Sequence, residues 1–193
     1  MVDNIEKILS PSPNKTFFTS DTHFGHAAII QYCSRPYKSV EEMNQVLIDN
    51  WNSKVKKDDI VYHLGDFIFG GSKLWYEIFS KLNGNIVLIM GNHDARNLRK
   101  DYDNLLYYRT NQLKINIDNT GIYLNHFPFL CYDYRHFIQL YGHVHSGPKS
   151  TSLDLDRLKL CYPEQYDVGV DNNNYYPISY YELKDIINKR KNK

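Results

Sequence analysis

Three short apolar segments, each followed at once by a polar cluster, constrain the fold of this chain more than any other feature. The segment at residues 86–90 is the clearest, because a continuous apolar run of this length is typical of a strand buried on both faces. Helical periodicity lies between the segments, so strands and helices alternate. This alternation predicts an α/β fold with its ligand groups at the carboxyl ends of the strands. The segments and the polar residues after them are 16–19 with Asp21 and His23, 60–64 with Asp66, and 86–90 with Asn92 and His93.

The rest of the chain predicts further helices and strands. A long helix is expected from residue 40, because Ser39 and Glu42 form a capping-box pattern ahead of apolar residues at helical spacing. A second helix is expected over residues 72–82, and a third begins at the capping box of Ser179 and Glu182. The remaining predicted elements are a hairpin over 113–117 and 122–124 and strands at 138–141 and 166–171.

Length and composition limit the class of protein. The 193 residues fit a single domain over residues 1–193, and the formal net charge of +1 offers no global electrostatic case for nucleic acid or an anionic membrane. No apolar run approaches the roughly 20 residues of a membrane span, and residues 1–15 lack the apolar core of a signal peptide. Cys33, Cys131 and Cys161 are odd in number and widely spaced, so we expect small buried thiols, a reducing compartment and a cytoplasmic protein.

Metal-binding side chains recur at the predicted strand ends. Each is a weak signal alone, because a single histidine beside a strand is more often structural than catalytic. Together they are strong, since six such side chains and an Asn-His pair occur in one domain. On an extended backbone the first Asp and His would share a face, and so would the last two histidines. The clusters in chain order are Asp21 and His23, Asp66, Asn92 and His93, His126, and His143 and His145.

The order Asp-x-His, Gly-Asp, Gly-Asn-His-Asp, His, Gly-His-x-His resembles the calcineurin-like metallophosphoesterase superfamily, and the motifs span residues 21–145. The resemblance implies a four-layer α/β fold of two packed mixed β-sheets flanked by helices. It places a dinuclear metal centre at one edge of the sheets. It also implies a small, compact phosphoesterase of the prokaryotic or phage type, with two divalent metal ions as cofactors.

The resemblance also implies a role for each cluster. Asp66 would bridge the two ions, with one carboxylate oxygen to each, and offset the repulsion between them. The ions would lower the pKa of a bridging water and so yield the hydroxide that attacks phosphorus. Manganese, iron, zinc, cobalt and nickel all suit such ligands, so the metals stay open. The implied ligands are Asp21, His23 and His145 for the first ion and Asn92, His126 and His143 for the second.

Further residues have candidate roles near the metals. In the family that the chain resembles, the position of His93 is not a ligand but contacts the phosphate and can protonate the leaving oxygen. Asp94 is a candidate for orienting His93. His26 and Arg96 are candidate substrate contacts; the alternatives are a structural hydrogen bond for His26 and a solvated surface position for Arg96. His63 lies inside a predicted buried strand and is expected in the core.

The sequence also bears on the substrate. The Asp-Arg-Gly element of the protein serine/threonine phosphatases is missing after Asp66, which favours a small phosphodiester or phosphomonoester, including one derived from a nucleotide. One alternative is a metal-dependent nuclease on RNA or DNA, disfavoured by the near-zero net charge. The other is a catalytically weak metal-binding interaction protein, disfavoured by the intact His93. Residues 146–165 could form a lid, an interface or a surface loop, and the oligomeric state is open.

Overall fold

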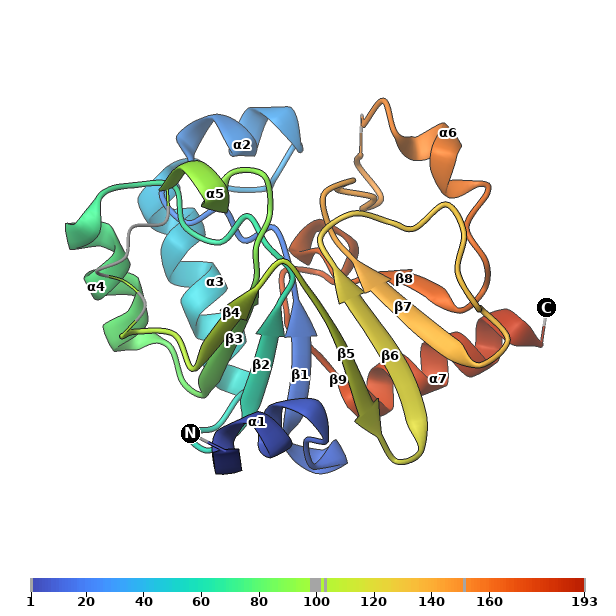
Figure 1. The fold of residues 1–193 in the computed structure, drawn as a ribbon. Helices are drawn as coiled ribbons and strands as arrows, with labels where there is room; N and C mark the ends of the chain where they lie inside the picture. Colours follow the sequence, from blue (N-terminus) through green and yellow to red (C-terminus); the bar gives the residue numbers. More distant parts are fainter. Residues whose placement is uncertain (1, 98–101, 103, 151, 193) are drawn as a thin grey trace.

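The computed structural model of the chain describes residues 2–97, 102, 104–150 and 152–192. Its strands form two sheets that stand beside one another in Figure 1. The first sheet has the strand order β4-β3-β2-β1-β9, and every neighbouring pair is parallel except β1 with β9. Its strands are β1 Thr16–Thr19, β2 Ile60–His63, β3 Asn85–Ile89, β4 Tyr108–Thr110 and β9 Ile178–Ser179.

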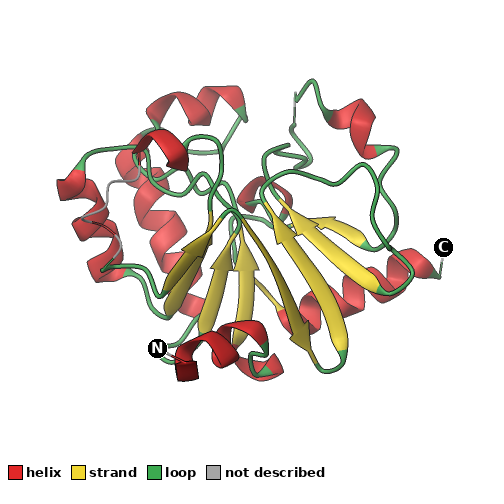
Figure 2. Cartoon of the chain, in the orientation of Figure 1, coloured by secondary structure: helices red, strands yellow, loops and turns green. Residues whose placement is uncertain are grey.

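The second sheet has the order β5-β6-β7-β8 and is also mixed. The predicted hairpin is confirmed as the antiparallel pair β5–β6, while β6–β7 and β7–β8 are parallel. The predicted α/β fold with two mixed sheets flanked by helices is therefore confirmed (Figure 2). The strands of this sheet are β5 Gln112–Ile117, β6 Thr120–Asn125, β7 Phe137–Tyr141 and β8 Gln165–Asp167.

The expected capping residues start two of the helices. The Ser39 side chain accepts the backbone N–H of Glu42 at the start of α3, and a reciprocal capping box of Ser179 and Glu182 starts α7. Lys189, Arg190 and Lys191 occupy the last turn of α7, where cations favour the helix dipole. The helices are α1 Val2–Leu9, α2 Ala27–Tyr32, α3 Val40–Lys54, α4 Ser72–Lys81, α5 Asp94–Asn97, α6 Leu155–Leu158 and α7 Tyr180–Lys191, with 3-10 turns at Pro13–Lys15 and Val170–Asn172.

Two apolar cores lie on the two faces of the first sheet. Neighbouring strand residues point to opposite faces, so Phe17 packs toward α3 and α4, where Trp51 and Trp75 are buried. Phe18 packs toward the second sheet and α7, in a core that includes Leu124 of β6. The register makes the last residues of β1 and β2 partners, so the loops after both strands begin at the same level. In Figure 1 the arrows of β1, β2, β6 and β7 point upward, so their carboxyl ends face the loops above the sheets.

Some sequence predictions fail for local reasons. The strand expected over residues 166–171 ends at Asp167, because side chains compete with the ladder for the backbone: Asn172 and Asn173 donate to the Asp167 carbonyl oxygen. The chain then turns into the 3-10 segment. The strands β4 and β9, of three and two residues, are too short to show periodicity, and the sequence did not predict them.

The cysteines differ from the expectation of small buried thiols. All three are free, as expected, but Cys131 is exposed and Cys33 and Cys161 are only half-buried. Their burial in the core was therefore predicted wrongly. Among the residues that the structure describes, none of the helices combines the length and the apolar character needed to cross a membrane.

Candidate metal centre

The loops at the carboxyl ends of the strands bring the predicted ligands together. The loops after β1 and β2 pair backbone to backbone, since the N–H groups of Asp21 and His23 donate to the carbonyl oxygens of Gly65 and Asp66 at 2.9 and 3.0 Å. The loop after β7 joins them, because the N–H of His143 donates to Oδ2 of Asp21 at 2.9 Å. Residues far apart in the chain therefore share one rigid frame.

The backbone at these positions is left-handed, not extended. The φ angles are +56° at Asp21, +51° at His23, +56° at Asp66, +71° at His143 and +47° at His145. The expectation that alternation along an extended strand aligns these side chains is therefore wrong. Residues other than glycine adopt this conformation at a cost of about 1–3 kcal/mol each, which the hydrogen bonds between the loops offset.

Two motif glycines lie where no side chain fits. A Cβ at Gly91 would stand 2.3 Å from Oδ1 of Asp66, and a Cβ at Gly142 would stand 2.0 Å from Oγ of Ser20 and 2.3 Å from Oδ2 of Asp21. The glycine before Asn92 and the glycine before His143 thus let the loops approach the two carboxylates.

The first cluster of ligand atoms comes from the loops after β1 and β7. Asp21, His23 and His145 each offer one atom, and these atoms lie within 4.8 Å of one another. Oδ1 of Asp21 is 4.0 Å from Nε2 of His23 and 3.8 Å from Nε2 of His145. Two ligands that share an ion at about 2.0–2.2 Å lie at most about 4.4 Å apart, so the spacing fits one cation.

The second cluster lies beside the first. Asp66, His126 and His143 offer atoms within 4.8 Å of one another. Nδ1 of His126 donates to the Leu64 carbonyl oxygen at 2.7 Å, so Nε2 is the ring nitrogen that faces the cluster. Oδ1 of Asn92 stands 3.0 Å from that nitrogen. A ring nitrogen and an amide oxygen at this spacing are close enough to bind the same cation.

Asp66 lies between the clusters. Its Oδ2 is 3.7 Å from Nε2 of His23 in the first cluster and 3.6 Å from Nε2 of His126 in the second. Its Oδ1 accepts the backbone N–H of His93 at 3.0 Å. Oδ2 is thus the oxygen that faces both clusters, while the loop after β3 takes up Oδ1. The arrangement with one oxygen toward each ion stays a prediction.

Burial and charge at this site fit a divalent cation. Oδ1 of Asp21 and Nε2 of His23 are buried and have no hydrogen-bond partner among the described residues, although buried polar atoms rarely go unpaired. Burial, which is the largest cause, and the neighbouring Asp21 carboxylate raise the pKa of Asp66 to about 6. Burial, again the largest cause, and the neighbouring His145 hold the pKa of His23 well below its usual value. Neutral imidazoles and crowded carboxylates are the groups that a metal ion stabilises.

A buried ion pair behind the first cluster was missed by the sequence reading. Nδ1 of His145 donates to Oδ2 of Asp171 at 2.7 Å, and Nε and Nη2 of Arg35 donate to both oxygens of that carboxylate at 2.9 Å. Arg35 also donates to the carbonyl oxygens of Asp21 and Thr22. Burial, the largest single cause, lowers the pKa of His145, but the hydrogen bonds to Asp171 and Cys33 and the charges of Asp21 and Asp171 together outweigh it and raise that pKa to about 11. Carboxylates that hold a histidine in this way fix its tautomer and raise its basicity as a ligand.

Two more buried carboxylates organise the loops. Asp94 accepts the backbone N–H groups of Asp66, Phe67 and Gly91 at 2.7, 3.0 and 2.8 Å. It therefore ties the loops after β2 and β3 together and does not orient the His93 side chain. Asp167 accepts the N–H of Ser146 at 3.1 Å, and so holds the residue next to His145. Asp167 carried no signal in the sequence beyond its place in a predicted strand.

The remaining predicted residues have distinct positions. His93 is 36% exposed at the rim, with Nε2 3.8 Å from Oδ2 of Asp66. His26 stacks on Phe69 at 4.2 Å, and its Nδ1 lies 3.2 Å from Nδ1 of His23, which supports the structural alternative for His26. Arg96 is exposed on α5, and no described residue of the site binds its guanidinium.

His63 is buried in the core, as expected, and lies behind the loop after β1. The Thr22 hydroxyl donates to the Phe67 carbonyl oxygen, so Nε2 of His63 is the donor in the 3.0 Å contact with Thr22. Nδ1 has no partner among the described residues. Burial, which is the largest cause, lowers the pKa of His63 to about 3.

Comparison with known proteins agrees with this site. A family model described as calcineurin-like phosphoesterase matches residues 15–186. The chain is 35% identical to the uncharacterized protein MJ1445 of Methanocaldococcus jannaschii over 182 residues, which cover 93% of this chain and 95% of that protein. It is 29% identical to the Gene 66 protein of Mycobacterium phage D29, over 82% of this chain and 88% of that protein. The crystal structure of AQ665 from Aquifex aeolicus, a protein of unknown function, superposes with a TM-score of 0.67 and 26% identity, over 89% of this chain and 98% of that one. Because the family model matches most of its length, the chain belongs to the calcineurin-like phosphoesterase family.

Proposed function

We propose that the protein is a two-metal-dependent phosphoesterase that hydrolyses a small phosphodiester or phosphomonoester. The observation that carries the proposal is the position of Oδ2 of Asp66, at 3.7 and 3.6 Å from one nitrogen in each of the two clusters. A carboxylate oxygen shared in this way offsets the repulsion of two neighbouring dications. The proposed ligands are Asp21, His23 and His145 for one ion, Asn92, His126 and His143 for the other, and Asp66 for both.

The protein residues set up the chemistry before any substrate arrives. When bound, two divalent ions supply the Lewis acid for the phosphoryl oxygens and lower the pKa of a water that attacks phosphorus. Asp171 holds His145, and the Leu64 carbonyl oxygen holds His126, so that Nε2 of each histidine faces its cluster. The left-handed loops keep these side chains in place, and this preorganisation is the main contribution of the protein.

We assign the role of general acid to His93. Its backbone N–H is anchored on Oδ1 of Asp66, while its partly exposed ring stands at the rim on the same side as Oδ2. From there a protonated imidazole can reach the leaving oxygen of a phosphoester held over the clusters. Anchoring through the backbone leaves both ring nitrogens available for this purpose.

The surroundings of Asp66 favour a small substrate over a phosphoprotein. Phe67 and Ile68 follow it and are buried, so no guanidinium stands where the protein serine/threonine phosphatases carry one. The buried Arg35 is already engaged by Asp171 and by two carbonyl oxygens. Arg35 is therefore not free to bind the phosphate of a substrate.

Metal analysis combined with turnover tests the proposal. Protein reconstituted in turn with manganese, iron, zinc, cobalt and nickel is expected to bind two ions per chain and to hydrolyse bis(p-nitrophenyl) phosphate with at least one of them. Asp66→Asn should lose metal and activity together, because a neutral amide cannot offset two dications. Asp118→Asn is the matched control, since this exposed carboxylate pairs with Lys184 on the surface. Wild-type metal affinity in Asp66→Asn, or two bound ions without turnover on any small phosphoester, would refute the proposal.

A further inference from the structure

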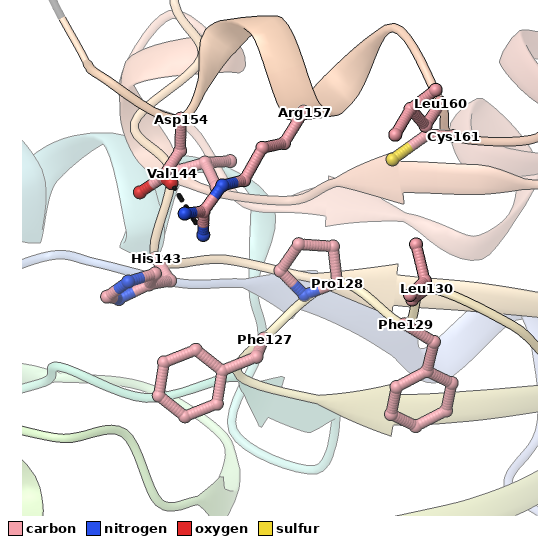
Figure 3. Close-up of a pocket in the computed structure, with 10 residues that line it drawn as sticks. All are labelled: Phe127, Pro128, Phe129, Leu130, His143, Val144, Asp154, Arg157, Leu160 and Cys161. Carbon is pink, nitrogen blue, oxygen red and sulfur yellow. Dashed lines mark ion pairs between the residues drawn. The ribbon is translucent and has the colours of Figure 1, made fainter.

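A cavity of ≈ 600 Å³ opens beside the second cluster of the candidate metal centre. Figure 3 shows His143 at one end of it, Phe127 and Leu130 on one wall, and Arg157 and Leu160 on the other. The first wall follows β6, and the second belongs to the segment 146–165, for which the sequence left a lid, an interface or a surface loop open. The volume falls in the range of about 300–1,000 Å³ that is usual for small-molecule sites.

The apolar wall begins at the metal ligands themselves. The centroid of the Phe127 ring lies 4.6 Å from that of His143 and 4.9 Å from that of His126, and both pairs of rings meet edge to face. A group attached to a phosphate over the clusters would therefore pass directly onto an aromatic surface. Leu130 and Leu160 are 83% and 69% exposed on the two walls, so a ligand between them would remove apolar surface from water.

One polar pair interrupts this apolar lining. Arg157 contacts Asp154 at 3.1 Å, as the dashed line in Figure 3 marks, and its side chain is 82% exposed. An exposed pair of this kind contributes little to the stability of the fold. It places hydrogen-bond donors and acceptors inside a cavity whose other lining side chains, apart from His143 and Cys161, are hydrocarbon. A flat ring with a polar edge matches this combination better than a plain hydrocarbon ring does.

We propose that this cavity binds the nucleobase of a nucleotide-derived phosphoester whose phosphate lies over the metal centre. The inference rests on the proposed function, since the metal centre fixes where the phosphate sits. The base would stack on Phe127 and lie between Leu130 and Leu160, with its polar edge toward Asp154 and Arg157. Residues 154–161 then act as the specificity wall of the site.

The test compares two ligands that differ only in the base. Calorimetric titration of the manganese-loaded protein uses the phosphonate analogues of AMP and of ribose 5-phosphate, whose P–C bond is not hydrolysed. Stacking and burial of one base should make the AMP analogue bind about 5- to 150-fold more tightly. In the double variant Leu130→Ser, Leu160→Ser the ratio of the two dissociation constants should fall toward one. The ratio corrects for any change in phosphate binding, because both ligands carry the same phosphonate.

Leu153→Ser is the matched control. Leu153 lies on the same segment and is 98% exposed, but it does not line the cavity, so this variant should keep the wild-type ratio. Equal binding of the two analogues by the wild type, an unchanged ratio in the double variant, or phenylphosphonate binding as tightly as the AMP analogue would overturn the inference. Failure of the metal-loaded wild type to hydrolyse any small phosphoester would instead overturn the proposed function, and the binding ratio would still decide the role of the cavity.

Discussion

The variant Asp171→Asn tests the buried ion pair behind the metal centre. The Arg35 and Asp171 side chains are 0% and 6% exposed, so neither is screened by solvent. Removing one partner of such a pair costs about 3–5 kcal/mol, because the other charge stays buried without compensation. For a chain of this size each kcal/mol lowers Tm by about 2–4 °C, so the expected loss is about 6–20 °C.

The same substitution should weaken metal binding at the first cluster. The amide cannot accept the Nδ1–H of His145 as strongly as the carboxylate, and loss of such a partner typically reduces metal affinity about 10–100-fold. Differential scanning calorimetry of the metal-free protein gives the change in Tm, and titration with a competing chelator gives the affinity of each ion. Glu77→Gln is the control, because it breaks only the exposed pair with Lys81 and should leave both Tm and metal affinity near the wild-type values.

The double variant Arg35→Met, Asp171→Asn separates the two effects. Replacing a buried charge by an apolar side chain of similar length removes the uncompensated charge, so part of the lost stability should return. The metal affinity should not return, because His145 still lacks its carboxylate. A single variant whose Tm stays within about 2 °C of the wild type, or a double variant that regains full metal affinity, would refute this account.

Three further predictions concern other parts of the site. His93→Ala should keep both ions but lose kcat by about 10²–10⁴-fold on substrates with alkoxide leaving groups, and much less on nitrophenyl esters; loss of an ion, or an unchanged kcat on both, would contradict the role of general acid. In a broad panel, kcat/KM should be highest for a small phosphodiester or nucleotide, and a phosphoserine peptide at the top would contradict the substrate class. His63, with its pKa lowered to about 3, binds fewer protons in the folded than in the unfolded state, so it contributes stability that is present above its ordinary pKa and is lost as pH falls. In urea denaturation the loss of stability between pH 7 and pH 5 should be smaller in His63→Phe than in the wild type by about 2 kcal/mol; equal pH slopes for both proteins would rule it out.

Much of the fold could be predicted because it depends on local patterns. The apolar run at residues 86–90 became β3, and the capping residues Ser39 and Ser179 start α3 and α7. The five clusters of polar residues were also visible, since each directly follows a strand. Parallel strands end at one edge, so proximity of the first three clusters followed from the alternation of strands and helices. That the histidines after β6 and β7 join them was implied only by the resemblance to the family. The very short β4 and β9 could not be predicted, because two or three residues show no periodicity.

The sequence by itself determined which side chains stand at the carboxyl ends of the strands and that they suit two cations. Only the tertiary structure decided how they are aimed. The left-handed turns at Asp21 and His143, the shared Oδ2 of Asp66, and the pairing of Arg35 with Asp171, 136 residues away, all depend on hydrogen bonds between distant loops. A periodic pattern reports only which face of an element is buried. The direction of a ligand atom depends on contacts that form after the strands have paired, and these leave no local trace in the chain.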